Sequence, residues 1–125
     1  MEATKKTPAG IKVDINRRAF DFGVRVLGLC EFLDATPGIR WSLSKQLFRA
    51  GTSIGANIEE AQAGQSRADF ISKMNIALKE AREAHYWLRM IVAGKILPEA
   101  RVADLKQEAD EIKRILGSII VSTKK

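Results

Sequence analysis

A line of four polar side chains interrupts a stretch of small and apolar residues near the middle of the sequence. The four stand at positions 49, 53, 57 and 60, and this spacing places them on one face of a helix. A half-buried arginine or asparagine in such a line needs polar partners, because an unpaired group costs free energy. Glu80 and Glu83 come within reach of Arg49 if the next helix runs antiparallel, which predicts a structural polar lock; a ligand or nucleic-acid site is the alternative. The predicted lock comprises Arg49, Ser53, Asn57, Glu60 and Glu83.

Basic side chains next to an aromatic ring form a second set with recognisable chemistry. Lys79, Arg82 and Arg89 share one flank of a predicted helix with Tyr86. Lysine and arginine contact phosphates and tyrosine stacks on bases, so the set favours nucleic-acid binding with little sequence preference. A solvated basic face with acidic neighbours is the alternative. Three arginines of the first predicted helix add charge, and the predicted contacts are Lys79, Arg82, Tyr86, Arg89, Arg17, Arg18 and Arg25.

The residues that usually carry catalysis or bind metals are sparse. His85 is the only histidine, and no glutamate stands three residues before it, as a di-metal helix bundle requires. Ser53 or Cys30 would need a neighbouring base to act as a nucleophile, and nothing in the sequence supplies one specifically. We therefore predict no catalytic, cofactor or metal site, and we expect His85 to be a hydrogen-bonded core residue.

The bulk composition fits one basic globular domain. The chain has 125 residues and a net charge of +6, which modestly favours a polyanionic partner. Cys30 is the only cysteine, so no disulfide forms within the chain, and this suits a reducing compartment. The first residues do not resemble a signal peptide, and no apolar run approaches the roughly 20 residues of a membrane span. We expect a cytoplasmic protein.

Four segments with apolar residues at helical spacing predict an all-α fold. Glycine and proline separate these segments, and the short links favour antiparallel neighbours, so we predict an up-down-up-down four-helix bundle without a sheet. Asp14 or Asn16, Ser42 and Ser66 are the expected caps of the first three helices, and Pro98 opens the fourth. The expected organisation is a flexible tail (1–13), the bundle (14–122) and a short C-terminal tail (123–125).

Two of the predicted helices carry more apolar surface than a single core needs. The first and the third each add an apolar stripe that points away from the predicted core line. Extra stripes, one of them with a tryptophan, are typical of subunit interfaces and predict a homo-oligomer. A wide core in an irregular bundle is the alternative. The predicted interface comprises Phe20, Val24, Leu27, Ile76, Trp87 and Ile91.

Two glycines stand four residues apart inside the second predicted helix. Gly51 and Gly55 each cost about 1 kcal/mol relative to alanine at such a position. Because their neighbours Ala50, Ser53 and Ala56 are also small, we predict that another helix approaches closely here. Simple tolerance of glycine is the alternative.

The residues from Arg49 to Glu60 carry a family resemblance. They read R-A-G-T-S-I-G-A-N-I-E-E, which resembles the R-A-x-x-S-I-x-x-N-I-x-E signature of the bacterial four-helix bundle proteins, many of them called ribosomal-RNA intervening-sequence proteins. Ser66 to Phe70, with Ala77, Glu83 and Leu88, resemble the third helix of that family. The similarity covers about residues 17–120. Two departures are Glu59-Glu60-Ala61, where the family usually has Ala-Glu-Gly, and Lys79-Glu80 in place of a Gly-Ser pair.

The resemblance implies an antiparallel four-helix bundle and a ring-like homopentamer. Its pattern also favours Glu83 over Glu80 as the partner of Arg49. One relative, from diversity-generating retroelements, is an accessory protein that binds a reverse transcriptase and nucleic acid. We therefore expect a non-enzymatic accessory protein that binds RNA or DNA through phosphates, with a reverse transcriptase or another protein as a further partner. A protein-interaction scaffold without nucleic-acid binding is the alternative.

Overall fold

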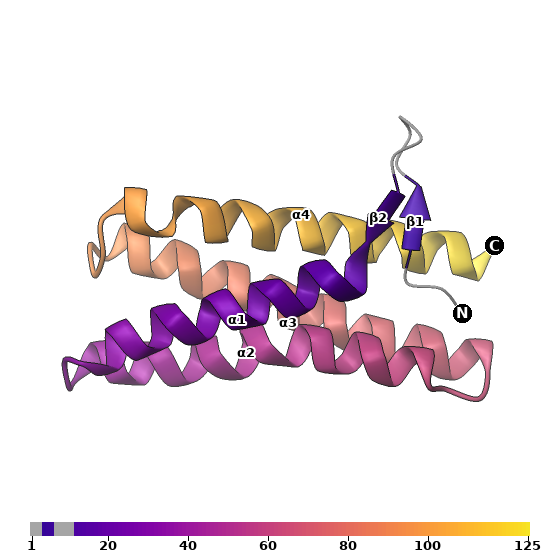
Figure 1. The fold of residues 1–125 in the computed structure, drawn as a ribbon, viewed down its shortest axis with the longest axis horizontal. Coiled ribbons are helices and arrows are strands. Elements are labelled where there is room, and N and C mark those ends of the chain that lie inside the picture. The colour runs from indigo at the N-terminus through magenta and orange to yellow at the C-terminus, as the bar shows by residue number, and fades with distance from the viewer. Residues whose placement is uncertain (1–3, 7–11) are drawn as a thin grey trace.

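Four long antiparallel helices form the body of the protein in a computed structural model that describes residues 4–6 and 12–125 (Figure 1). The helices are α1 (Ile15–Asp34), α2 (Ile39–Gln62), α3 (Arg67–Ala93) and α4 (Glu99–Lys124). Each helix packs against its neighbours in the chain, and α1 meets α4 to close the bundle. The predicted all-α four-helix bundle is confirmed. α4 runs two residues beyond the predicted end of the domain at 122. Among the described residues, no helix is long and apolar enough to cross a membrane.

A small β-ribbon precedes the bundle. Strand β1 (Thr4–Lys6) pairs antiparallel with β2 (Lys12–Asp14), with Lys5 opposite Val13. We predicted no sheet from the sequence, and the ribbon shows that this part of the prediction was wrong. A strand of three residues is too short to show the alternation of apolar and polar residues that predicts a strand. The lysines make this alternation still harder to recognise. The remainder of the predicted tail, residues 1–3 and 7–11, lies outside the described residues.

The helix starts follow local capping chemistry. The Asp14 side chain accepts a hydrogen bond from the Arg17 amide at 3.2 Å, and Ser66 accepts one from the Asp69 amide at 3.1 Å, as predicted. The expectation for Ser42 was wrong, because α2 already begins at Ile39. Gly38 has φ 103°, a conformation that favours glycine, and it starts the helix one turn earlier.

The core runs the length of the bundle and contains the inward faces of all four helices. On α3 this face is wider than predicted, because the helix packs against both α2 and α4. Ile91 is therefore fully buried, and so is Ala84, one helical turn before Leu88. This corrects the placement of Ile91 at a subunit interface. The expected core residue His85 is only partly buried.

The glycines of α2 allow α1 to approach closely, as predicted. A Cβ at Gly51 would lie 2.8 Å from Cγ2 of Val26, and Gly23 of α1 faces the same turn of α2. A Cβ at Gly55 would contact the backbone of Ala19 at 3.5 Å. The two helices therefore meet with almost no side chain between them at these positions.

We expect Gly51→Ala to destabilise the protein by about 1–3 kcal/mol, because the added methyl overlaps Val26 and forces α1 away. Gly28→Ala is the matched control: Gly28 also lies within a helix, but a Cβ there meets open space. This control should be neutral or stabilising by up to about 1 kcal/mol. Urea denaturation of both variants measures the difference. Equal stability of the two variants would contradict the close approach.

Candidate functional site

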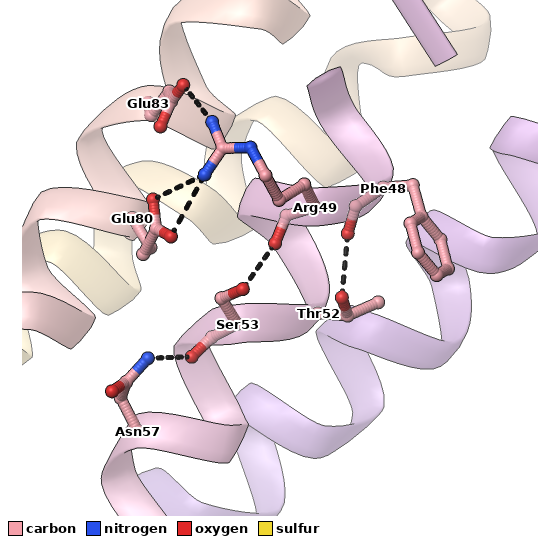
Figure 2. A network of polar contacts seen from close by, with 7 residues as sticks. All are labelled: Phe48, Arg49, Thr52, Ser53, Asn57, Glu80 and Glu83. Carbon is pink, nitrogen blue, oxygen red and sulfur yellow. Dashed lines mark hydrogen bonds and ion pairs between the residues drawn. The ribbon is translucent and has the colours of Figure 1, made fainter. Parts of the chain in front are cut away.

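An arginine on α2 bridges two glutamates of α3. The guanidinium of Arg49 donates from Nη2 to Glu83, and its Nη1 lies 3.3 Å from Oε2 of Glu80 (Figure 2). Glu80 and Glu83 are three residues apart on one face of α3, so a single planar guanidinium reaches both carboxylates. The structure therefore joins Arg49 to both candidates rather than to Glu83 alone.

Two other residues of the predicted polar line form hydrogen bonds within α2. Ser53 Oγ donates to the carbonyl oxygen of Arg49, and Asn57 Nδ2 donates to that of Ser53 at 2.8 Å (Figure 2). Such bonds to the carbonyl four residues earlier satisfy a polar side chain without a partner helix. Glu60 is exposed near the end of α2 and makes no contact with this network. Within the line, only Arg49 links two helices.

Because Glu80 is buried, its charge costs more free energy than the other charges of the network. Its side chain is only 11% exposed, whereas that of Arg49 is 51% exposed. Burial raises the pKa of Glu80 above its ordinary value, the neighbouring Glu83 raises it further, and Arg49 opposes both effects. The guanidinium thus neutralises a carboxylate that would otherwise be stranded at the α2–α3 contact.

A shallow hollow of about 870 Å³ lies beside this network, and α3 supplies most of its lining. It brings together Lys79, Arg82, Tyr86 and Arg89, four of the predicted nucleic-acid contacts. The tyrosine is exposed, and the Arg89 guanidinium lies 5.6 Å from the centre of its ring. Among the described residues, none of the three basic side chains forms an ion pair. We call these four residues the basic face of α3.

The arginines of α1 do not extend this face. Arg17 pairs with Asp21 at 3.2 Å, and Arg18 binds Glu108 at 2.6 Å and Glu111 at 2.7 Å on α4. The hydrogen bond with Glu108 is the main reason that the pKa of Arg18 rises further above its ordinary value. Sequence reasoning missed this link, because the two glutamates stand 90 and 93 positions after Arg18 and only the closed bundle brings them together.

A groove between α1 and α4 holds the third arginine of α1. Arg25 lines this groove together with Arg101, whose guanidinium stacks on the ring of Phe32 at 3.9 Å. In the order of the helices around the bundle, the α1–α4 groove lies across the core from the α2–α3 contact. Arg25 is therefore available to an anion, but not as part of the basic face of α3.

Burial shifts the pKa values of both His85 and Cys30. Burial lowers the pKa of His85, and the positive charges of Lys113 and Arg89 lower it further. Burial raises the pKa of the Cys30 thiol, which donates to the Ser44 carbonyl at 3.4 Å, and this disfavours the thiolate. No cluster of three or more metal-ligating side chains occurs in the described part of the chain.

The predicted interface residues divide between surface and core. The α1 stripe is exposed, with Val24 52% exposed, and Ile76 on α3 is also at the surface. Trp87 is half-buried and packs against the core, so only part of it is available to a partner. With Ile91 buried, the α3 stripe is smaller than predicted. The α1 stripe comprises Phe20, Val24 and Leu27.

Comparison with known proteins identifies related sequences and a related fold. The model of the family described as 23S rRNA-intervening sequence protein matches residues 12–118. A crystal structure of a protein with unknown function from the S23 ribosomal protein family of Bacteroides thetaiotaomicron is 42% identical. It matches with a TM-score of 0.78 over 85% of this chain and 94% of that chain. No curated protein matches the sequence.

We expect Arg49→Ala to lower the free energy of unfolding by about 1–2 kcal/mol at neutral pH, because it strands the buried carboxylate of Glu80. The half-exposed guanidinium keeps the loss below that of a fully buried pair. Because the pKa of Glu80 is raised, the ionised carboxylate destabilises the folded protein. Protonation removes this cost in free energy as the pH falls below that pKa. The deficit should therefore shrink in acid, as urea denaturation at several pH values would measure.

The control for this prediction is the double variant Arg49→Ala/Glu80→Gln. The amide removes the stranded charge, so the double variant should recover most of the lost stability at neutral pH. An equal loss in the single and double variants would show that Arg49 acts through packing alone.

Proposed function

We propose that the chain, which belongs to the 23S rRNA-intervening sequence protein family, is a homo-oligomeric, non-enzymatic accessory protein of the cytoplasm that binds nucleic acid through phosphates. The observation that carries the proposal is the basic face of α3, where three cations without ion pairs surround an exposed tyrosine. The family description concerns ribosomal RNA, which makes RNA the first nucleic acid to test.

The spacing of the basic face suits an extended strand. Lys79, Arg82, Tyr86 and Arg89 follow each other at three, four and three residues along α3, so they share one side of the helix. Ten residues of helix span about 15 Å. That length brings three cations to a few consecutive phosphates, while the exposed ring of Tyr86 can stack on an unpaired base.

The two acids in the hollow do not cancel this charge. Both carboxylates are bound by the guanidinium of Arg49, which leaves an excess of positive charge over the lining as a whole. The wider sequence agrees, since residues 65–97 hold six basic residues and three acidic ones. Phosphate contacts of this kind give affinity with little dependence on base sequence.

Self-association would strengthen weak individual sites. The exposed α1 stripe presents three large apolar side chains on one face of the helix, next to a groove that extends to Thr52 and Ala56 of α2. Such a surface is typical of a subunit contact. Several copies of the basic face in one particle would act together on one strand. The scaffold without nucleic-acid binding remains the second candidate, and this apolar surface supports it equally.

We expect the triple variant Lys79→Ala/Arg82→Ala/Arg89→Ala to bind unrelated single-stranded RNAs about tenfold more weakly, or worse, at about 50 mM salt. Filter binding at several salt concentrations measures this. The wild-type log–log slope should be about −2 for three phosphates per site, and the variant should lose most of it. Tyr86→Ala should also weaken binding, whereas Tyr86→Phe should retain it, because stacking needs only the ring.

The matched control removes the same charge elsewhere. Lys45, Lys124 and Lys125 are exposed and lie outside the hollow. Their triple alanine variant should bind RNA nearly as well as the wild type. Equal losses in the two triple variants would show that only net charge matters, and no binding by the wild type would favour the scaffold.

We expect Val24→Glu to dissociate the oligomer and leave the helices intact, because a charge buried in an apolar contact has no partner. Light scattering gives the mass, and circular dichroism gives the helix content. Val121→Glu is the control: Val121 is 58% exposed on α4, away from the stripe, so it should keep the wild-type mass. A wild-type protein that is monomeric at micromolar concentration would remove this part of the proposal.

A further inference from the structure

An apolar cleft lies between the N-terminal half of α2 and the C-terminal half of α3. It encloses about 410 Å³ and is lined mainly by Ile39 and Leu43 from α2, Trp87 and Met90 from α3, and Ile96 from the following turn. It shares no lining residue with the basic hollow. A volume of this size falls within the range of ligand-binding clefts.

The cleft is open rather than collapsed, and its rim is apolar. Ile39 is 68% exposed and Met90 is 44% exposed. An apolar surface that continues from a cleft onto its rim is typical of an interaction site. The lining on α2 extends from Ile39 to Gln46, which is about 10 Å or two helical turns. The occupant should therefore be a segment about two turns long.

The stretches of α2 and α3 that line the cleft contain basic residues and no acidic residue. Residues 39–58 of α2 and residues 84–98 of α3 and its turn contain no aspartate or glutamate. Arg40 stands at the rim, where its Nη2 donates to the Ile96 carbonyl at 3.1 Å, and Lys95 follows the cleft residue Gly94. These cations make the rim complementary to a segment that carries acidic side chains.

The indole of Trp87 provides an independent indication that the cleft is incomplete. Its Nε1 is buried, and it has no hydrogen-bond partner among the described residues. A buried donor without an acceptor costs about 1–3 kcal/mol. An occupant that brings a carbonyl oxygen and shifts the indole toward it would recover part of this cost.

We infer that the cleft between α2 and α3 docks a short amphipathic segment of a partner protein, with apolar side chains in the cleft and acidic side chains against Arg40 and Lys95. This is the helix-in-groove mode of recognition. Nucleic acid fits less well because the lining offers it apolar surface instead of cations.

A designed peptide tests this docking site directly. The probe is an alanine-based helix of about 16 residues, long enough to hold helical structure, with leucines at i, i+3, i+4 and i+7 and glutamates on both flanks. One matched peptide has lysine for each glutamate, and another has alanine for each leucine. The full chain is used with Trp41→Phe, so that Trp87 is its only tryptophan. Trp41 is exposed and does not line the cleft.

We expect the glutamate peptide to change the emission of Trp87 and to bind at least about tenfold more tightly than either matched peptide. Ile39→Ser/Met90→Ser should weaken that binding by about tenfold and leave RNA binding unchanged, because both residues lie outside the basic hollow. Both side chains are exposed, so these changes should preserve the fold. Arg40→Gln should weaken binding of the glutamate peptide and have little effect on the lysine peptide.

Three results would overturn the inference. Equal affinity for the three peptides would show that the cleft does not select acidic apolar segments. Binding that is insensitive to Ile39→Ser/Met90→Ser would place the contact elsewhere. Peptide binding that appears only in the Val24→Glu monomer would show that a second copy of the chain fills the cleft. In the first two cases the RNA-binding proposal is unaffected, because its variants and its readout are separate.

Discussion

A carboxylate buried between two helices is the constraint around which this surface is arranged. Glu80 occupies a position on the inner side of α3, where an ionised side chain is costly. Arg49 must therefore cross from α2, and it takes Glu83 as a second acceptor. Both acids on this side of α3 are then occupied, which leaves Lys79, Arg82 and Arg89 without acidic partners. The positive surface is thus a consequence of how the buried charge of Glu80 is neutralised.

The helices and their register could be predicted from the sequence because their causes are local. Asp14 and Ser66 cap helices through residues three positions away, and Gly51 signals a close neighbour by its cost in a helix. Features that depend on residues far apart in the sequence could not be predicted. The partners of Arg18 are on α4, and the burial of Ile91 depends on how widely two helices cover α3. Neither follows from spacing along a single helix.

The candidate site shows the same division. Helical spacing alone placed the four residues of the basic face together, since they lie within three turns of one helix. The apolar cleft was not foreseen, because it needs residues from two helices and from the turn after α3. Ile39 gave no signal, since the second helix was expected to begin at Ser42. A shift of one turn in a helix start therefore hid one of the residues that line the cleft.

α3 carries different surfaces around nearly its whole circumference. One side belongs to the core, a second holds the basic face, and a third forms the wall of the cleft beside α2. Tyr86 and Trp87 are adjacent in sequence, their rings meet edge to face at 5.2 Å, and they line different hollows. Almost any substitution between residues 76 and 96 thus alters packing, charge or apolar surface. Substitutions without effect should therefore be rare on α3 among related chains, and they should accumulate instead on the outer side of α4.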